Sequence, residues 1–160
     1  SILELIGKGN VLGGEIELRR HNENAIKKHP MYKRIKILKG SSIDPKIFEK
    51  VKEIAKNNKK ILVILDSDHT KNHVLKELNL YSQFVSKDNY IIVCDTIIHD
   101  FPKNWFYSHG INRPWNKSNN PKTAVWKFLK QNNRFKIDKS IEDKLLITTS
   151  PDGFLKCIKN

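Results

Sequence analysis

Two aspartates and a histidine are the residues of this sequence whose types and spacing best suit chemistry. Asp66 follows an apolar run, Ile61–Leu65, and Asp95 follows a second apolar run that begins at Tyr90. Neighbouring strands lie about 4.8 Å apart, so carboxylates at their adjacent carboxyl ends can share one cation. Oxygen ligands suit a hard divalent ion such as Mg²⁺, which keeps several waters. We therefore predict a metal site at Asp66 and Asp95, with Thr96 adding an oxygen directly or through water.

His69 lies three residues after Asp66 and is the candidate catalytic base. Near neutral pH an imidazole can take a proton from a substrate hydroxyl, and a nearby cation would lower the pKa of that hydroxyl. The alternative is that His69 is a turn residue bonded to backbone and that the aspartates cap helices. Helical spacing between His69 and His73 also suggests zinc, but no third soft ligand lies near them. Cys94 is soft and therefore a poor ligand for Mg²⁺.

This chemistry requires a strand, a turn and a helix that bring the side chains to one sheet edge. The unbroken aliphatic run 61–65 is typical of a strand buried on both faces, as in a parallel sheet. Residues 70–81 carry Val74, Leu78 and Tyr81 on one helical stripe, and a second strand follows over 90–96. Open α/β sheets bind ligands at this carboxyl edge.

The other segments alternate in the same way and predict an α/β fold, a mostly parallel sheet in three layers. We expect a helix end at 1–6, strands at 11–18, 34–38 and 134–137, and helices at 21–29, at 45–57 and from Pro121 onward. A turn signal at 151–153 separates two apolar segments, 145–148 and 154–158, which we expect to pair as an antiparallel hairpin. The long connection 97–120 carries several aromatic residues and is typical of a lid or binding loop.

A second group of candidates lies in the first third of the chain. Glu15 and Glu17 end the strand predicted at 11–18, where an acidic residue in a nucleotide-type α/β fold accepts ribose hydroxyls. Gly40, Ser41 and Ser42 follow the next strand. These three residues border an adenine, cap the helix that starts at Pro45, or do both.

Composition narrows the class of protein. The chain has 160 residues, enough for one domain with a core, and a net charge of +13. Its lysines are spread over nearly every segment, so we attribute the charge to composition and regard a nucleic-acid partner as the weaker alternative. No apolar run reaches transmembrane length, and the first residues are not a signal peptide. The two cysteines, Cys94 and Cys157, indicate buried thiols in a reducing compartment, so we expect a cytoplasmic protein.

Seven motifs, in their order along the chain, resemble those of the cephalosporin hydroxylase family. They are Gly-Ser-Ser-Ile-Asp at 40–44, Leu-Asp-Ser-Asp-His-Thr at 65–70, Glu-Leu-x-Leu-Tyr at 77–81, Val-Cys-Asp-Thr at 93–96, Arg-Pro-Trp at 113–115, Asn-Asn-Pro-Lys-Thr-Ala-Val at 119–125 and Pro-Asp-Gly-Phe at 151–154. Despite its name, that family has the class I S-adenosylmethionine-dependent methyltransferase fold and includes rhamnosyl O-methyltransferases. The resemblance covers nearly the whole chain.

The resemblance implies a metal-assisted O-methyltransferase that acts on a sugar or other small molecule. It implies S-adenosylmethionine as cofactor, with Glu15 or Glu17 at the ribose, Gly40, Ser41 and Ser42 near the adenine, and Asp66 beside the cofactor. It also implies Mg²⁺ on Asp66, Asp95 and Thr96, with His69 as base, as in the similar site of catechol O-methyltransferase. Where many members have Glu-Asp-Thr, this chain has Cys94-Asp95-Thr96.

The family's first strand and its glycine-rich cofactor loop are expected before Ser1, so the resemblance implies that the first βα unit is missing and that the chain is a fragment. A non-catalytic remnant or binding module is the main rival interpretation, and it predicts neither metal dependence nor methyl transfer. A nucleic-acid-binding protein is the weaker rival and would bind with steep salt dependence. A homo-oligomer is compatible with either interpretation.

Overall fold

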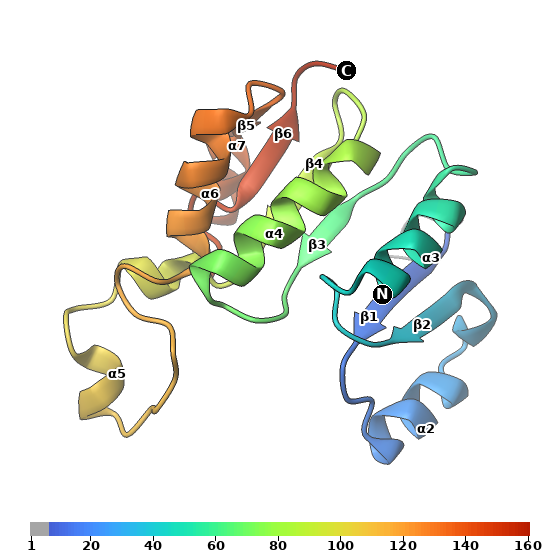
Figure 1. Ribbon diagram of the computed structural model, residues 1–160, viewed down its shortest axis with the longest axis horizontal. Coiled ribbons are helices and arrows are strands. Elements are labelled where there is room, and N and C mark those ends of the chain that lie inside the picture. The colour runs from blue at the N-terminus through green and yellow to red at the C-terminus, as the bar shows by residue number, and fades with distance from the viewer. Residues whose placement is uncertain (1–6) are drawn as a thin grey trace. The chain divides into compact units, whose positions relative to one another are not determined.

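The computed structural model describes residues 7–160 (Figure 1). The helix end predicted at residues 1–6 lies outside them. The chain divides into two compact units, Ser1–Ile54 and Ala55–Asn160, and each contains a sheet of its own. We describe each unit by itself.

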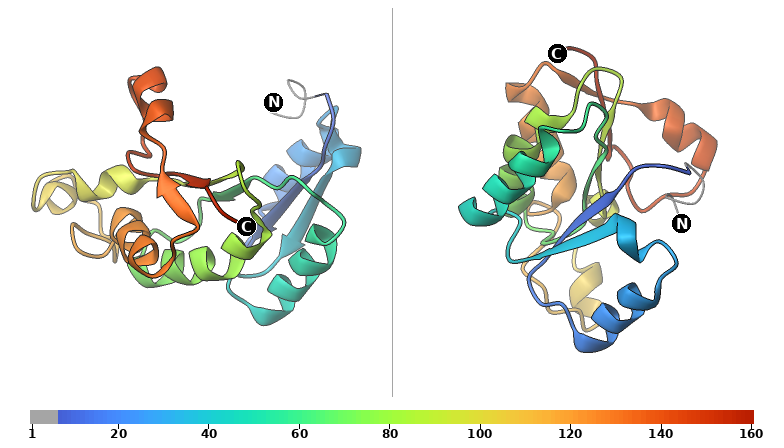
Figure 2. Two further views of the ribbon diagram at one scale, coloured as in Figure 1. Left: turned by 90° about the horizontal axis from the view of Figure 1, so that it is seen from above. Right: turned by 90° about the vertical axis from the view of Figure 1, so that its right-hand side faces the viewer.

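The first unit is a parallel pair of strands with one helix on either side. Its elements are β1 (Val11–Glu15), α2 (Arg20–Lys28), a 3₁₀ turn (Tyr32–Arg34), β2 (Ile35–Lys39) and α3 (Pro45–Ala55). The strands pair in register from Val11 with Ile35 to Glu15 with Lys39, and α2 and α3 lie on opposite faces (Figure 2). Helix α3 begins at a proline, whose fixed φ suits the first helical turn, and Asp44 Oδ1 accepts a hydrogen bond from the Lys46 amide at 2.7 Å.

The second unit is built on a four-stranded sheet with the order β3-β4-β6-β5. The strands are β3 (Val63–Leu65), β4 (Tyr90–Val93), β5 (Phe135–Ile137) and β6 (Phe154–Cys157), and the helices are α4 (Lys71–Tyr81), α5 (Trp105–Ser108), α6 (Pro121–Gln131) and α7 (Lys139–Leu145), with 3₁₀ turns at Ser82–Phe84 and Thr96–His99. β3 and β4 are parallel, whereas β6 is antiparallel to both of its neighbours. The predicted strand–helix–strand unit is therefore confirmed.

Helices lie on both sides of this sheet, which gives three layers (Figure 2). α4 and α6 pack side by side on one face, whereas α7 stands on the other side and buries none of its residues. The core between α4, α6 and the central strands is fully buried, with Leu78, Ile91, Val125 and Leu155 each 0% exposed. This arrangement places the end of β3, the start of α4 and the end of β4 at one edge of the sheet.

The predicted C-terminal hairpin is wrong in one of its strands. Residues 145–148 form no strand, because Asp138 caps helix α7 by accepting from the Ser140 amide at 3.1 Å, and the helix runs to Leu145. Leu146 and Ile147 follow it exposed. β6 pairs instead with β5 and β4. The turn at 151–153 is tight, since a Cβ on Gly153 would lie 2.3 Å from the Val93 carbonyl oxygen.

Several predicted strands are shorter than expected, and the one predicted over 90–96 ends at Val93. β1 ends at Glu15, so Glu17 lies beyond the strand. β3 covers only Val63–Leu65, and Ile64 is 49% exposed, so this run is not buried on both faces. The physical reason is position, since β3 pairs only with β4 among the described residues and forms an edge of its sheet.

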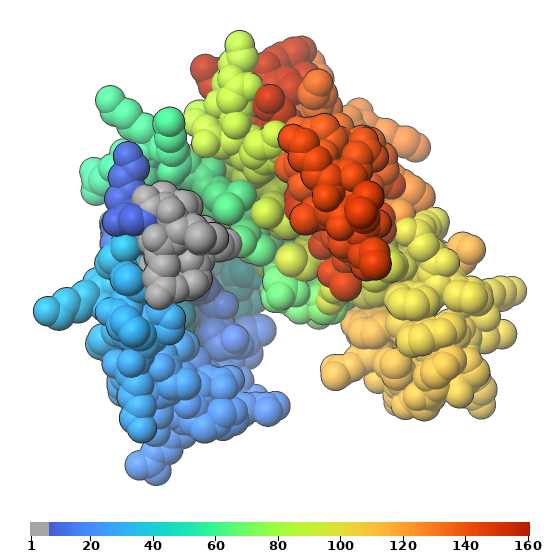
Figure 3. Space-filling model, turned by 180° about the vertical axis from the view of Figure 1, so that it is seen from behind, coloured from blue at the N-terminus to red at the C-terminus, as the bar shows by residue number. Residues whose placement is uncertain are grey.

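The connection between β4 and α6 carries α5 and projects from the rest of the second unit. In Figure 3 its yellow atoms form a lobe at one side. Its rings pack on one another: Phe101 stacks on Trp105 at 4.3 Å and Trp105 on His109 at 4.2 Å, both between ring centroids. Among residues 7–160, none of the helices combines the length and the apolar character that a membrane crossing requires.

Candidate active site

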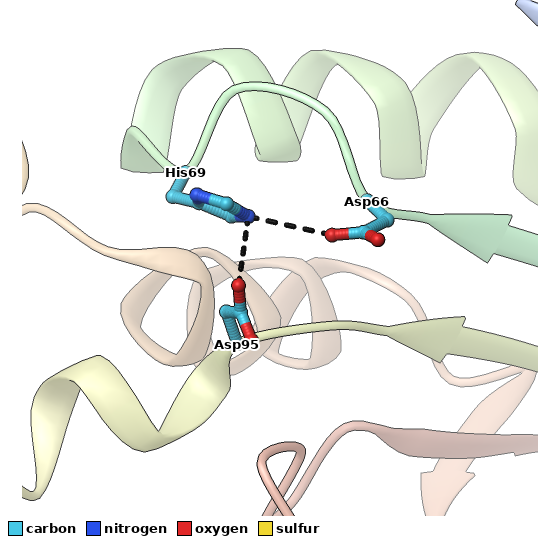
Figure 4. Close-up of side chains that lie close together, drawn as sticks. All are labelled: Asp66, His69 and Asp95. Atoms are coloured by element: carbon cyan, nitrogen blue, oxygen red, sulfur yellow. Dashed lines mark ion pairs between the residues drawn. The ribbon is translucent and has the colours of Figure 1, made fainter. Parts of the chain in front are cut away.

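The ends of β3 and β4 bring the two predicted carboxylates together. The Cys94 amide donates to the Leu65 carbonyl at 2.9 Å, which extends the pairing of the strands to the residues just before Asp66 and Asp95. Asp95 has φ 53° in the left-handed region, which aspartate tolerates better than most residues. This turn ends the strand and starts the 3₁₀ turn Thr96–His99. Both carboxylates face the turn that follows β3 (Figure 4).

His69 completes the cluster from that turn. Its Nε2 atom lies 3.5 Å from Asp66 Oδ1 and 3.2 Å from Asp95 Oδ2. The imidazole is largely buried, whereas both carboxylates reach solvent. Figure 4 shows the ring edge pointing between the two carboxylates. The structure therefore brings three of the predicted site residues to one point.

The chemistry of the three side chains fits a divalent cation. One candidate ligand atom from each lies within 4.8 Å of the others. His69 Nε2 is buried and, within the described part of the chain, makes no hydrogen bond. A further group at this point would satisfy the nitrogen. Mg²⁺ needs only a few protein oxygens because it retains water, and two carboxylates supply them.

Thr96 and Cys94 lie beside the cluster without joining it. The Thr96 hydroxyl is buried and donates to the Pro151 carbonyl at 2.6 Å, so the structure gives it a backbone partner. Burial, together with the negative charges of the Asp66 and Asp95 carboxylates, raises the pKa of the Cys94 thiol to about 11. Cys94 is consequently a neutral thiol at neutral pH. The role of Thr96 as a cation ligand stays a prediction.

The predicted cofactor residues of the first unit lie at the carboxyl ends of β1 and β2. The Gly40 amide donates to the Glu15 carbonyl at 2.9 Å, which brings Glu15 beside Gly40, Ser41 and Ser42. Gly40 has φ +146°, and a Cβ there would lie 2.7 Å from Ile47 Cγ1, so glycine is required at this point. Ser41 Oγ accepts from the Ile43 amide at 3.4 Å, while Glu17 lies beyond the strand and is exposed.

An aromatic segment adjoins the acidic cluster. The Trp115 ring lies 6.1 Å from the His69 ring in a T-shaped arrangement and 4.8 Å from the Phe106 ring. Sequence reasoning did not identify the residue that holds this segment, Asn119. Asn119 Nδ2 donates to the Pro114 carbonyl at 2.9 Å, and its Oδ1 accepts from the Lys71 amide at 2.8 Å. Trp115 is thereby tied to the first residue of α4, two positions after His69.

The sequence matches a known family over almost its whole length. Residues 1–158 match the family described as Rhamnosyl O-methyltransferase/CmcI. Rhamnosyl O-methyltransferases of Mycobacterium bovis (strain BCG / Pasteur 1173P2) and Mycobacterium tuberculosis (strain ATCC 25618 / H37Rv) are each 32% identical to this chain over 120 residues. The match covers 74% of this chain and 45% of each relative, so the chain spans about half the length of the curated relatives it matches.

Two solved structures with a similar fold are complexes of one methyltransferase. MycE Methyltransferase from the Mycinamycin Biosynthetic Pathway, in complex with Mg and SAH, matches with a TM-score of 0.50, 18% identity and coverage of 81% of this chain and 32% of that one. Its complex with Mg, SAH and Mycinamycin VI matches with a TM-score of 0.52 and 15% identity, over 99% of this chain and 38% of that one. At this identity the likeness shows the fold, a Rossmann-like methyltransferase fold.

Proposed function

This chain belongs to the Rhamnosyl O-methyltransferase/CmcI family. On this basis we propose that it functions as an S-adenosylmethionine-dependent, cation-assisted O-methyltransferase. The acceptor is a hydroxyl group of a sugar or other small molecule. The observation that carries the proposal is the juxtaposition of His69 Nε2 with the carboxylates of Asp66 and Asp95. Rhamnosyl O-methyltransferases among its relatives support the sugar acceptor, and structural neighbours with Mg and SAH support the cofactors.

In the proposed reaction each residue of the cluster has one task. Asp66 and Asp95 would hold a divalent cation through their carboxylate oxygens, with Thr96 as a candidate further ligand. The bound cation would lower the pKa of the acceptor hydroxyl. His69 takes the hydroxyl proton at Nε2. S-adenosylmethionine supplies the methyl group and leaves as its demethylated thioether. The chain thus contributes positioning and proton transfer.

The remaining site residues bind the two substrates. Glu15 or Glu17 accepts hydrogen bonds from the ribose hydroxyls of S-adenosylmethionine. The loop of Gly40, Ser41 and Ser42 borders its adenine. Asp66 lies beside the cofactor as well as the cation. On the acceptor side, the Trp115 ring next to His69 offers an apolar surface for the C–H face of a sugar. A ring-shaped acceptor that stacks on Trp115 would lie within reach of the imidazole.

Separate measurements of cation binding and methyl transfer test the proposal. We expect Asp66→Asn and Asp95→Asn to weaken Mg²⁺ binding in calorimetric titration by about 10-fold or more, because each removes one of two charged ligands. We expect His69→Gln to bind Mg²⁺ nearly as well as the wild-type chain and to transfer radiolabelled methyl groups to rhamnosides about 10²- to 10⁴-fold more slowly.

The matched control is Asp143→Asn, which removes an exposed carboxylate on α7 and leaves the cluster intact. It should change neither measurement. Full transfer activity in His69→Gln would exclude the imidazole as the base, and a wild-type chain that binds neither Mg²⁺ nor S-adenosylmethionine would favour the non-catalytic alternative.

A further inference from the structure

A charged residue lies inside the apolar face of α4. Glu77 is 2% exposed, between Val74 at 3% and Leu78 at 0%. Burial of a carboxylate costs several kcal/mol, roughly, unless hydrogen bonds and charges compensate for the lost water. A leucine or methionine would fit the face of this helix at no such cost. The partners of Glu77 therefore indicate why the carboxylate is there.

A hydrogen bond connects Glu77 to the turn that carries the candidate active-site cluster. Ser67 Oγ donates to Glu77 Oε1 at 2.7 Å. One helical turn before Glu77, His73 places its Nε2 atom 3.5 Å from the same oxygen. Ser67 directly follows Asp66 and lies two residues before His69. The hydrogen bond thus joins the buried face of α4 to the middle of the site turn.

A second contact holds the same turn from its exposed side. Asp68 Oδ1 accepts from the Thr70 amide at 2.7 Å, which leads the chain into α4. The four side chains of the turn therefore have different partners. Asp66 and His69 belong to the cluster, Ser67 bonds to Glu77 on the buried face of α4, and Asp68 bonds to the amide at the start of the helix. Of these contacts, only the bond between Ser67 and Glu77 reaches the packed core.

We infer that Glu77 is a positioning residue, which acts through Ser67 to hold the Asp66 carboxylate and the His69 imidazole in the arrangement that binds the cation and the acceptor hydroxyl. This inference rests on the proposed function. Glu77 itself touches neither reactant. Anchoring matters because a displacement of about 1 Å in a reacting group can lower a rate about 100-fold.

A purely structural role for Glu77 makes a different prediction, and four variants separate the two. Ser67→Ala removes the donor at an exposed residue and should fold normally. Glu77→Met removes the acceptor at similar size, whereas Glu77→Gln keeps an acceptor oxygen. Leu78→Ala is the control, because it opens a cavity on the same helix without touching the turn.

The first experiment titrates Mn²⁺ into each variant of the full chain and follows the free ion by electron paramagnetic resonance. We expect Ser67→Ala and Glu77→Met each to weaken Mn²⁺ binding about 10-fold, as removal of groups that orient metal ligands does. The double variant should be no weaker than the weaker single variant, because both remove the same bond. Glu77→Gln should stay within about threefold of wild type, and Leu78→Ala should bind Mn²⁺ normally despite its lower stability. Wild-type affinity in folded Ser67→Ala and Glu77→Met would overturn the inference.

A second readout does not depend on a metal. Long-range ¹H–¹⁵N NMR of the His69 imidazole, assigned with His69→Gln, should show shifted or broadened signals in Ser67→Ala and unchanged signals in Leu78→Ala. If the wild-type chain binds no Mn²⁺, the metal part of the proposed function fails, and these spectra still decide the positioning role. Unchanged His69 signals in Ser67→Ala would then reject that role.

Discussion

At the scale of single residues, the candidate active site is a cluster of titratable side chains. Asp66 and Asp95 bring two negative charges to one sheet edge, and His69 lies between them. The Cys94 thiol responds to the same charges. Its pKa is raised from 9.0 to about 11 by burial first and by the two carboxylates next. Cys94 is therefore a natural reporter of the charge at the site.

We predict that Cys94 is alkylated slowly by iodoacetamide at pH 8, because only the thiolate reacts and a raised pKa makes the thiolate scarce. The rate should rise about tenfold per pH unit until the pH approaches the pKa. Asp95→Asn should accelerate the reaction at fixed pH, since loss of a negative charge lowers the pKa of the thiol. Mass spectrometry of the labelled peptides measures each rate, with fully buried Cys157 as an internal comparison.

The same shift has a consequence for stability. The folded chain holds the Cys94 proton more tightly than the unfolded chain, so the contribution of this group to stability is unchanged below pH 9 and declines as the pH rises from 9 towards 11. Cys94→Ala should lose this part of the alkaline decline in the free energy of unfolding. A Cys94 that reacts as fast as a small-molecule thiol would contradict the assigned environment.

At the scale of elements, the start of α6 supports the site from the side. Asn120 is fully buried and forms a reciprocal capping box with Thr123, in which its side chain accepts from the Thr123 amide at 3.0 Å. Its Nδ2 atom also donates to the Asn116 and Lys117 carbonyls, each at 2.8 Å. Next to it, Asn119 binds the first amide of α4. This pair of asparagines joins two helices and the aromatic loop.

We predict that Asn120→Ala lowers the free energy of unfolding by about 1–3 kcal/mol, through the lost cap and the carbonyls left without their donor. Urea denaturation followed by circular dichroism measures the change. Ser118→Ala removes an exposed hydroxyl that donates to Asn116 Oδ1 at 2.9 Å and should cost about 0.5 kcal/mol or less. Equal changes in the free energy of unfolding would show that the buried cap contributes no more to stability than the exposed hydroxyl.

At the scale of the whole molecule, the chain consists of two compact units with separate sheets. The active-site cluster, the aromatic loop and the largest buried side chains all belong to the second unit. The net charge of +13 is carried by lysines in both units. A nucleic-acid partner stays the weaker prediction, since the family relatives include sugar methyltransferases.

We predict that a fragment of residues 55–160 folds without the first unit, because the core between its sheet and helices α4 and α6 is built within this unit, with Leu78, Ile91 and Leu155 fully buried. It should unfold in urea in a single cooperative transition, with a slope of about 1–3 kcal/mol/M, and should bind Mn²⁺ as the full chain does. Circular dichroism and the resonance titration provide the two measurements, with the full chain alongside. A fragment without a cooperative transition would show that this unit needs residues of the first.

Local patterns in the sequence were enough to predict most of the elements and the residue types of the candidate site. Apolar runs that end in Asp66 and Asp95, and a helical stripe at Val74, Leu78 and Tyr81, are local patterns, because side-chain periodicity follows from strand and helix geometry alone. The position of Glu77 on this apolar stripe can also be read from the local pattern. The hydrogen-bond partner of Glu77 cannot be predicted in this way.

Contacts between groups far apart in the chain could be seen only in the three-dimensional fold. β6 pairs with β5 and β4 and not with residues 145–148, because strand pairing depends on contacts between segments far apart in the chain. His69 reaches both carboxylates because Asp95 adopts a left-handed backbone conformation, and Glu77 acquires a partner because Ser67 turns towards α4. Such contacts depend on side-chain direction and three-dimensional packing, for which one-dimensional periodicity carries no information.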